Sequence, residues 1–124
     1  MMRRLIRAAI RNATVTRGEG QSLRIDPVIL RAADILPLEE VEVVHHTTGQ
    51  RALAFAENGE DGEIVVPHAR AGDAVSILSW GLLHDGQTLA HRARLVTLDA
   101  SNRIVALTET DVTDAAPRDT AAER

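Results

Sequence analysis

Short runs of β-branched and aliphatic residues, separated by turns, most constrain how this chain folds. Such runs alternate with turns rich in glycine, asparagine and aspartate from residue 40 onward. We expect six strands there, at residues 40–46, 51–57, 64–67, 73–80, 92–98 and 102–108. The turns TTGQ and DASN make hairpins of the first and last pairs, and the two middle runs are typical of strands buried on both faces.

The first forty residues predict one more strand region and one helix. Residues 5–16 follow no single period, although ATVT favours a strand at their end. RGEG is a turn, and SLRID at residues 22–26 alternates as a half-buried strand does. Asp26 followed by Pro27 is a helix start, and Pro37 ends the helix near Asp34. A barrel removes the exposed edges of so many strands, so we expect an all-β barrel with one short helix near residues 27–34.

Length and composition favour a single domain. The 124 residues are enough for one core, which must be aliphatic because Phe55 and Trp80 are the only aromatic residues. We expect the domain at residues 1–112. Residues 113–124 are polar and rich in alanine and proline, so we expect a disordered tail.

The same composition excludes several functions. Two aromatic residues and a formal net charge of −4 disfavour nucleic acid as a partner. The absence of cysteine excludes disulfides, thiolate metal sites and cysteine nucleophiles. Arg7 and Arg11 interrupt the apolar residues near the N-terminus, so they form neither a signal segment nor a membrane span. We therefore expect a cytoplasmic protein with no membrane partner.

Ser22 has two interpretations from its position alone. It stands between a glycine-bearing turn and the strand that leads to the helix. It is either a strand-edge serine that hydrogen-bonds the turn, or a nucleophile that attacks its own backbone. The second interpretation makes the bond between Gln21 and Ser22 a site of self-cleavage.

The histidines indicate no metal site. His45 and His46 are adjacent in an expected strand, so they point to opposite faces and do not both line one site. A surface or interface position explains both, although either imidazole is able to act as an acid or base near neutrality. His68, His84 and His91 lie in turns without the spacing of metal ligands.

The order of elements and several motifs resemble one known family. The matching stretches are VT at 15–16, S-x-x-ID at 22–26, VILRAADILPLEEVEV, TGQR at 48–51, GEI at 62–64, AGDAVSILS at 71–79 and LVTLDASNRIV. Over roughly residues 3–108 the chain is similar to the pyruvoyl-dependent aspartate 1-decarboxylases. That resemblance implies a double-psi β-barrel, a homotetramer, and the production of β-alanine for pantothenate biosynthesis.

The resemblance also implies roles for particular residues. In that family the serine at the position of Ser22 attacks the carbonyl of the preceding residue and forms an ester. Elimination then cuts the chain and leaves a pyruvoyl cofactor, whose carbonyl is the electron sink for aspartate decarboxylation. Arg51 matches the residue that binds a substrate carboxylate, which a guanidinium does with two parallel hydrogen bonds.

Several positions depart from the family pattern. Gln21 replaces a glycine, a residue without Cβ that exposes its carbonyl to attack. Ala9 stands where the family has a lysine. Ala54 and Phe55 stand where it has a threonine and a tyrosine, so Phe55 keeps the ring without the hydroxyl. The loop VPHARAGD is shorter than its family counterpart.

Three hypotheses about function follow. The first is a pyruvoyl-dependent aspartate 1-decarboxylase that acts once Ser22 has been processed. The second is an uncleaved relative whose barrel pocket performs other small-molecule chemistry, such as a cyclisation or isomerisation. The third is a binding or assembly partner without catalysis, because one fold hosts many functions. The first two require a small carboxylate-bearing ligand.

Overall fold

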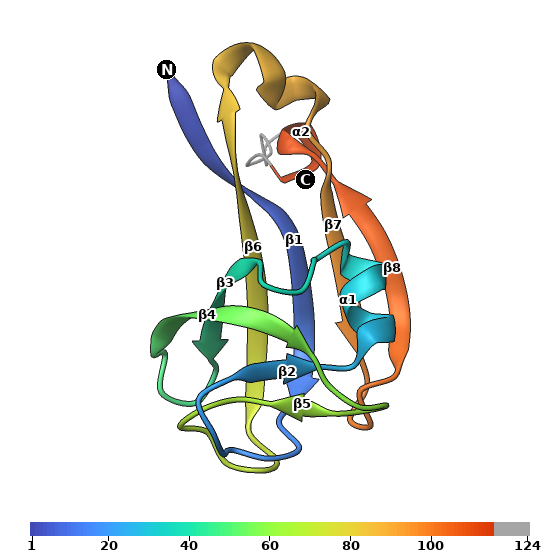
Figure 1. Ribbon diagram of the computed structural model, residues 1–124. Helices are drawn as coiled ribbons and strands as arrows, with labels where there is room; N and C mark the ends of the chain where they lie inside the picture. Colours follow the sequence, from blue (N-terminus) through green and yellow to red (C-terminus); the bar gives the residue numbers. More distant parts are fainter. Residues whose placement is uncertain (116–124) are drawn as a thin grey trace.

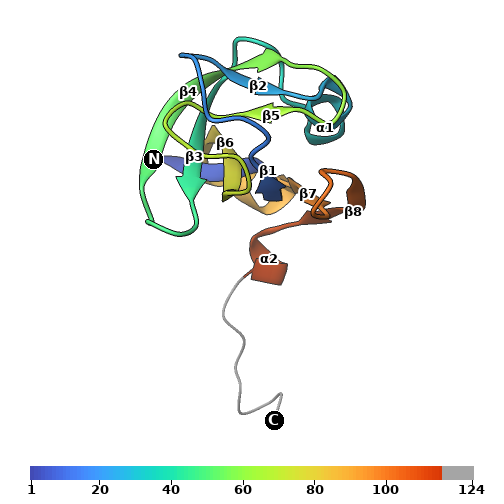
Figure 2. The ribbon, with the colours of Figure 1, turned by 90° about the horizontal axis from the view of Figure 1, so that it is seen from below.

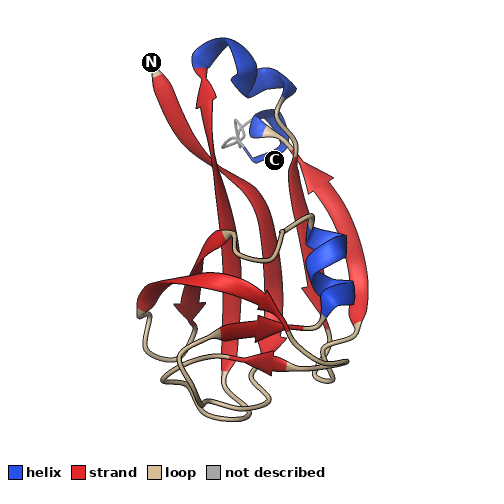
Figure 3. Ribbon diagram, in the orientation of Figure 1, coloured by secondary structure: helices blue, strands red, loops and turns tan. Residues whose placement is uncertain are grey.

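One mixed sheet of eight strands dominates the computed structural model, which describes residues 1–115 (Figures 1 and 3). The strand order is β5-β2-β4-β3-β6-β1-β7-β8. The strands are β1 (Met2–Thr14), β2 (Leu23–Ile25), β3 (Glu40–His45), β4 (Arg51–Asn58), β5 (Ile64–Val65), β6 (Ala74–His84), β7 (Ala93–Leu98) and β8 (Ile104–Thr110). The sheet curls into the all-β double-psi barrel that the resemblance implies.

The predicted helix is α1 (Pro27–Ala33), and its boundaries follow from its caps. One carboxylate oxygen of Asp26 accepts the N–H of Val28 at 2.8 Å, which satisfies an otherwise unpaired donor. Asp34 ends the helix in the left-handed conformation, with φ at 56°. Two further short elements, the 3₁₀ helix η1 (Asp85–Ala90) and the helix α2 (Val112–Ala115), were not predicted.

The N-terminal strand is much longer than expected. The sequence predicts a strand only at the end of residues 5–16, whereas β1 begins at Met2. It pairs antiparallel with β6 on one edge and parallel with β7 on the other. Two bulges, between Ile6 and Ala8 and between Ile10 and Ala13, shift the pairing with β6. Because each bulge changes which residues face the core, no single period runs through the segment.

The expectation that both middle runs are buried on two faces is correct for β5 and wrong for β6. Both residues of β5 are buried, whereas Val75, Ile77 and Ser79 of β6 alternate with neighbours that remain partly exposed. One face of β6 therefore borders the core, and the other lies on the outer side of the curled sheet. Apolar residues on both faces of a strand do not by themselves require burial of both faces.

The core is aliphatic, as the composition predicts. The crossing of β2, β4 and β5 over β1 and β6 encloses it, and Figure 2 shows this arrangement from below. The helix α1 packs against β7 and β1. The largest fully buried side chains are Ile10, Leu23, Ile25, Ile29, Leu30, Ile64, Ile77, Val15, Val41, Val65, Val75 and Val96.

From the sequence we expect the domain to end at residue 112 and a tail to follow it. The tail was expected to begin at residue 113, and residues 112–115 form α2. Residues 116–124 lie outside the described part of the structure, so the tail stays a prediction.

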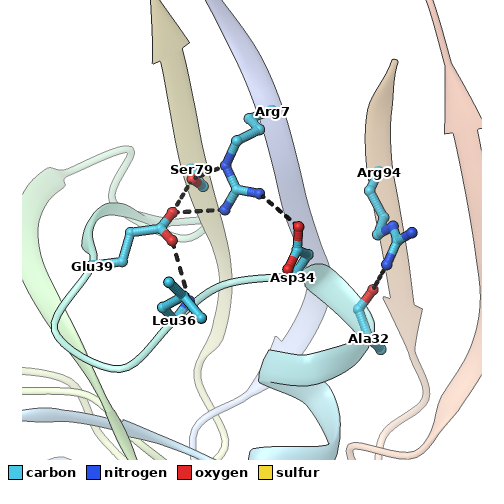
Figure 4. Close-up of polar contacts among 7 residues, drawn as sticks. All are labelled: Arg7, Ala32, Asp34, Leu36, Glu39, Ser79 and Arg94. Carbon is cyan, nitrogen blue, oxygen red and sulfur yellow. Dashed lines mark hydrogen bonds and ion pairs between the residues drawn. The ribbon is translucent and has the colours of Figure 1, made fainter. Parts of the chain in front are cut away.

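A partly buried polar cluster joins α1 to the central strands (Figure 4). Arg7 of β1 donates to a carboxylate oxygen of Glu39 at 2.7 Å and to the Ser79 hydroxyl at 3.1 Å. The Ser79 hydroxyl, which is 1% exposed, donates to Glu39 as well. Arg7 also lies 3.6 Å from Asp34, and the other Glu39 oxygen accepts the N–H of Leu36. The cluster thus fixes the segment between α1 and β3 against β1 and β6.

Folding lowers the pKa of Glu39. Burial alone raises this pKa, but the hydrogen bonds from Ser79, Arg7 and the N–H of Leu36 together outweigh burial. The Glu39 carboxylate therefore stabilises the fold above its ordinary pKa. That contribution is lost as the pH falls through the lowered pKa.

We predict that Glu39→Gln lowers the free energy of unfolding by about 1–2 kcal/mol near pH 7, because the charged acceptor of Arg7 is lost. The difference from the unsubstituted chain should be smaller near about pH 3 than near pH 7, because the carboxylate takes up a proton as the pH falls through the lowered pKa of Glu39. Urea unfolding at both pH values measures it, with Glu57→Gln as the control. An equal difference at both pH values would contradict the assignment.

Candidate functional site

The turn that carries Gln21 and Ser22 is held in place from both ends. Arg17 forms an isolated bridge with Val65, and Leu23 begins the parallel pairing of β2 with β4. Between them, Gly18 packs so closely on Ala69 that a Cβ at this position would lie 1.4 Å from the Ala69 carbonyl oxygen. The turn is therefore pressed against the loop between β5 and β6.

Gln21 and Ser22 differ in their surroundings. Gln21 is exposed, and it follows a glycine with φ at 75°. Ser22 is half-buried, and its hydroxyl makes no hydrogen bond within residues 1–115. The structure therefore does not place Ser22 as a strand-edge serine bonded to the turn. Whether its hydroxyl attacks the Gln21 carbonyl remains a prediction.

A cavity of about 600 Å³ lies beside this turn. We call it the central cavity. Its walls come from β3, β4, the turn before β2 and the loop after β5. The lining residues used below are Gln21, Glu40, His45, Arg51, Phe55 and His68. The fold thus brings the candidate cleavage residue Gln21 and the candidate carboxylate ligand Arg51 to one cavity.

Arg51 begins β4 opposite Val44 and is already bonded to an acid. Its Nη2 donates to a Glu42 oxygen at 2.8 Å, and the same oxygen accepts the indole N–H of Trp80 at 3.2 Å. The bond from Arg51, assisted by Trp80, lowers the pKa of Glu42. The Arg51 side chain is 52% exposed, and a guanidinium has five N–H donors, so it retains the capacity to bind a ligand carboxylate.

His45 and His46 separate as the strand geometry predicts. His45 lines the central cavity, and its Nε2 lies 2.9 Å from a carboxylate oxygen of Asp73. His46 is exposed, and its Nε2 lies 2.7 Å from the hydroxyl of Ser76. Hydrogen bonds from the N–H of Arg70 and from His45 lower the pKa of Asp73.

Sequence reasoning missed that His68 shares the cavity with His45. Nothing in their spacing relates the two residues, because they come from β3 and from the loop after β5. A signal does exist in the backbone. His68 has φ at 62°, in the left-handed region, which is uncommon for a residue other than glycine although histidine adopts it more often than most.

Ala9, Ala54 and Phe55 stand where the resemblance leads us to expect a lysine, a threonine and a tyrosine, and none of the three supplies a hydroxyl or an amine. Ala9 is 3% exposed on β1, and Ala54 lines the cavity with only a methyl group. Phe55 is 59% exposed at the cavity and has no hydroxyl. The chain contains no lysine and no tyrosine at all.

The described residues contain neither a cluster of metal-ligating side chains nor a helix able to span a membrane. Within residues 1–115, no three side chains of histidine, aspartate or glutamate are grouped so as to hold a metal ion. No helix in that part of the chain combines the length and the apolar character needed to cross a membrane.

The barrel and its cavity define a small β-protein in which an arginine lines a cavity beside a serine-bearing turn. Comparison with known proteins agrees with this class. The sequence model for aspartate decarboxylase matches residues 1–105. The aspartate 1-decarboxylase of Listeria monocytogenes is 34% identical over 114 residues, which cover 84% of this chain and 90% of that protein. Those of Listeria innocua and Listeria welshimeri are 33% identical over the same shares. The chain belongs to the aspartate decarboxylase family.

We predict that Gly18→Ala destabilises the fold by more than about 2 kcal/mol, because the added methyl group overlaps backbone that is not free to move. Gly86→Ala is the control, since a Cβ there meets nothing within 4 Å. Thermal unfolding of both variants measures the difference. Equal unfolding temperatures would show that the turn does not depend on this contact.

Proposed function

We propose that this chain is an aspartate decarboxylase-like enzyme that binds a small aminocarboxylate in the central cavity. The supporting observation is that Arg51 and Gln21 line one cavity although they come from separate elements. Arg51 binds the ligand carboxylate through the N–H donors that Glu42 does not use. Membership in the family supports aspartate as the ligand and β-alanine as the product.

The residues present supply the two groups from which a pyruvoyl cofactor forms, the Ser22 hydroxyl and the Gln21 carbonyl. The Ser22 hydroxyl has no competing hydrogen bond within the described residues, and the preceding carbonyl belongs to an exposed turn next to a flexible glycine. We propose that this hydroxyl attacks the Gln21 carbonyl and forms an ester. The chemistry that a pyruvoyl group at position 22 supplies is an electron sink for the loss of carbon dioxide.

The missing side chains limit the rates of the proposed self-cleavage and decarboxylation. Ala54 and Phe55 donate no hydrogen bond to an oxyanion, and Gln21 carries a Cβ beside the carbonyl under attack. Loss of one well-placed donor commonly slows turnover about 10²- to 10³-fold. Processing and decarboxylation are therefore expected to be slow.

The same losses favour a second candidate. An uncleaved chain with an intact Ser22 keeps the cavity and Arg51, and it performs either another small-molecule reaction or binding alone. The replacements at Gln21, Ala9, Ala54 and Phe55 support this candidate, because each removes a feature of self-cleavage or of decarboxylation.

A homo-oligomer is part of the proposal. The apolar side chains of Leu53, Phe55 and Leu82 are 61%, 59% and 68% exposed. Apolar exposure of this kind marks protein interfaces. The family that the chain resembles forms tetramers, which supports four copies.

The mass of the purified, aged protein is expected to show two fragments, split between Gln21 and Ser22, with a pyruvoyl group on the second. The Ser22→Ala chain is the control and remains whole, because it has no hydroxyl for the attack. A whole unsubstituted chain would exclude the pyruvoyl mechanism and favour the second candidate.

We predict that Arg51→Ala weakens the binding of L-aspartate to the uncleaved Ser22→Ala chain about 10- to 100-fold, since charged hydrogen bonds are lost. Titration calorimetry measures the dissociation constant. Arg103→Ala, which removes an exposed arginine on the turn between β7 and β8, should leave it unchanged. Equal affinities with and without Arg51 would remove this arginine from the site.

A further inference from the structure

A second cavity lies where β1 and β7 separate. Their parallel pairing runs from Ala8 to Arg11 on β1 and stops there toward the N-terminus of that strand. Beyond it the ring of His91 bridges the two segments. Its Nε2 donates to the Ile6 carbonyl at 2.7 Å, because a carbonyl only accepts. Figure 1 shows β1 and β7 moving apart toward the end of the molecule that carries α2. A cavity of about 330 Å³ lies here.

Most of the wall of this cavity, which we call the Trp80 cavity, is apolar. The wall comes from β1, β6, β7, the end of β8 and α2. Its apolar side chains are Leu5, Ile6, Trp80, Ala93, Leu95 and Val112. Pockets for small molecules have about 300–1,000 Å³, mostly apolar walls and a few polar groups that orient the ligand. The Trp80 cavity is at the small end of that range, and its walls favour a ligand with a hydrocarbon part.

Three ionisable side chains border the Trp80 cavity, and two of them already have partners. His91 is bonded to the Ile6 carbonyl, and a carboxylate oxygen of Asp111 lies 3.4 Å from Nη1 of Arg92. The third is Arg4, which is exposed and makes no hydrogen bond or ion pair within residues 1–115. Its five N–H donors are therefore available to a ligand.

Arg4 is nevertheless held in place by an aromatic ring. Its guanidinium carbon lies over the Trp80 ring at 4.2 Å from the centroid, which is a cation–π contact. The indole N–H of Trp80 donates to Glu42 at 3.2 Å, so the ring is fixed in turn. The guanidinium donors lie in the plane of the group, and stacking on a ring leaves them free. A positioned cation thus stands beside an apolar cavity.

We propose that the Trp80 cavity binds a small monocarboxylate with an apolar tail. The tail fills the cavity, and the carboxylate accepts two parallel hydrogen bonds from Arg4. A single negative charge suits the site. Asp111 lines the same cavity and Glu42 is close enough to attract Arg4, so a doubly charged phosphate would be repelled. The Trp80 cavity shares no lining residue with the central cavity, so this proposal does not rest on the proposed function.

The test uses the fluorescence of Trp80, the single tryptophan of the chain. We expect titration of the full-length chain with octanoate, below the concentration at which octanoate self-associates, to change this fluorescence along a saturable curve. The same titration with 1-octanol measures the contribution of the tail alone, because 1-octanol has no carboxylate.

Two pairs of variants separate the roles of the charge and of the wall. Arg4→Gln should weaken the binding of octanoate about tenfold and leave 1-octanol binding unchanged. Arg3→Gln is its control, since Arg3 is on the other face of β1 and donates to Asp85 at 2.6 Å. Val112→Asn should weaken the binding of both ligands, because it makes the wall polar. Val105→Asn, at a valine of β8 that is 61% exposed and does not line the cavity, should weaken neither.

Three results would overturn the inference. The first is the absence of a saturable fluorescence change with octanoate, which is the result expected if a second copy of the chain or the residues beyond 115 fill the cavity instead. The second is an equal loss of octanoate and 1-octanol binding in Arg4→Gln. The third is unchanged binding of both ligands in Val112→Asn.

Discussion

The pairing of β1 on both of its edges is the constraint on which the structure depends. Hydrogen bonds to β6 and to β7 leave β1 no free edge, and they join segments that are more than sixty residues apart in the chain. The two bulges of β1 bend it, which allows the sheet to curl around the aliphatic core. The cluster of Arg7, Glu39 and Ser79 then ties the segment after α1 to this frame. Two walls of the central cavity are formed by β3 and β4, which reach β1 through β6.

The lining of the central cavity combines an arginine with two histidines. Arg51 is paired with Glu42, an acid that also accepts the Trp80 indole N–H, so its guanidinium is oriented before any ligand arrives. His45 is oriented by Asp73 in the same way. The cost of positioning both side chains is therefore met on folding, which is how sites reduce the entropy lost on binding.

Where the family resemblance leads us to expect hydroxyls and an amine this chain has none, and two imidazoles line the cavity. The positions of Ala9, Ala54 and Phe55 offer no proton donor, whereas His45 and His68 line the cavity. An imidazole exchanges protons near neutral pH more readily than a phenol or an ammonium group does.

The sequence alone determined the features that rest on local rules. Asp26 and Pro27 specify the start of α1, the turn residues specify the hairpins, and the shortage of aromatic residues specifies an aliphatic core. The family motifs singled out Ser22 and Arg51. Only the tertiary structure decided that His68 and His45 share one cavity, that a carboxylate oxygen of Asp73 lies 2.9 Å from Nε2 of His45, and that Glu42 occupies one donor of Arg51. These contacts arise from strand pairing between distant segments, and no local period or spacing records which strands become neighbours.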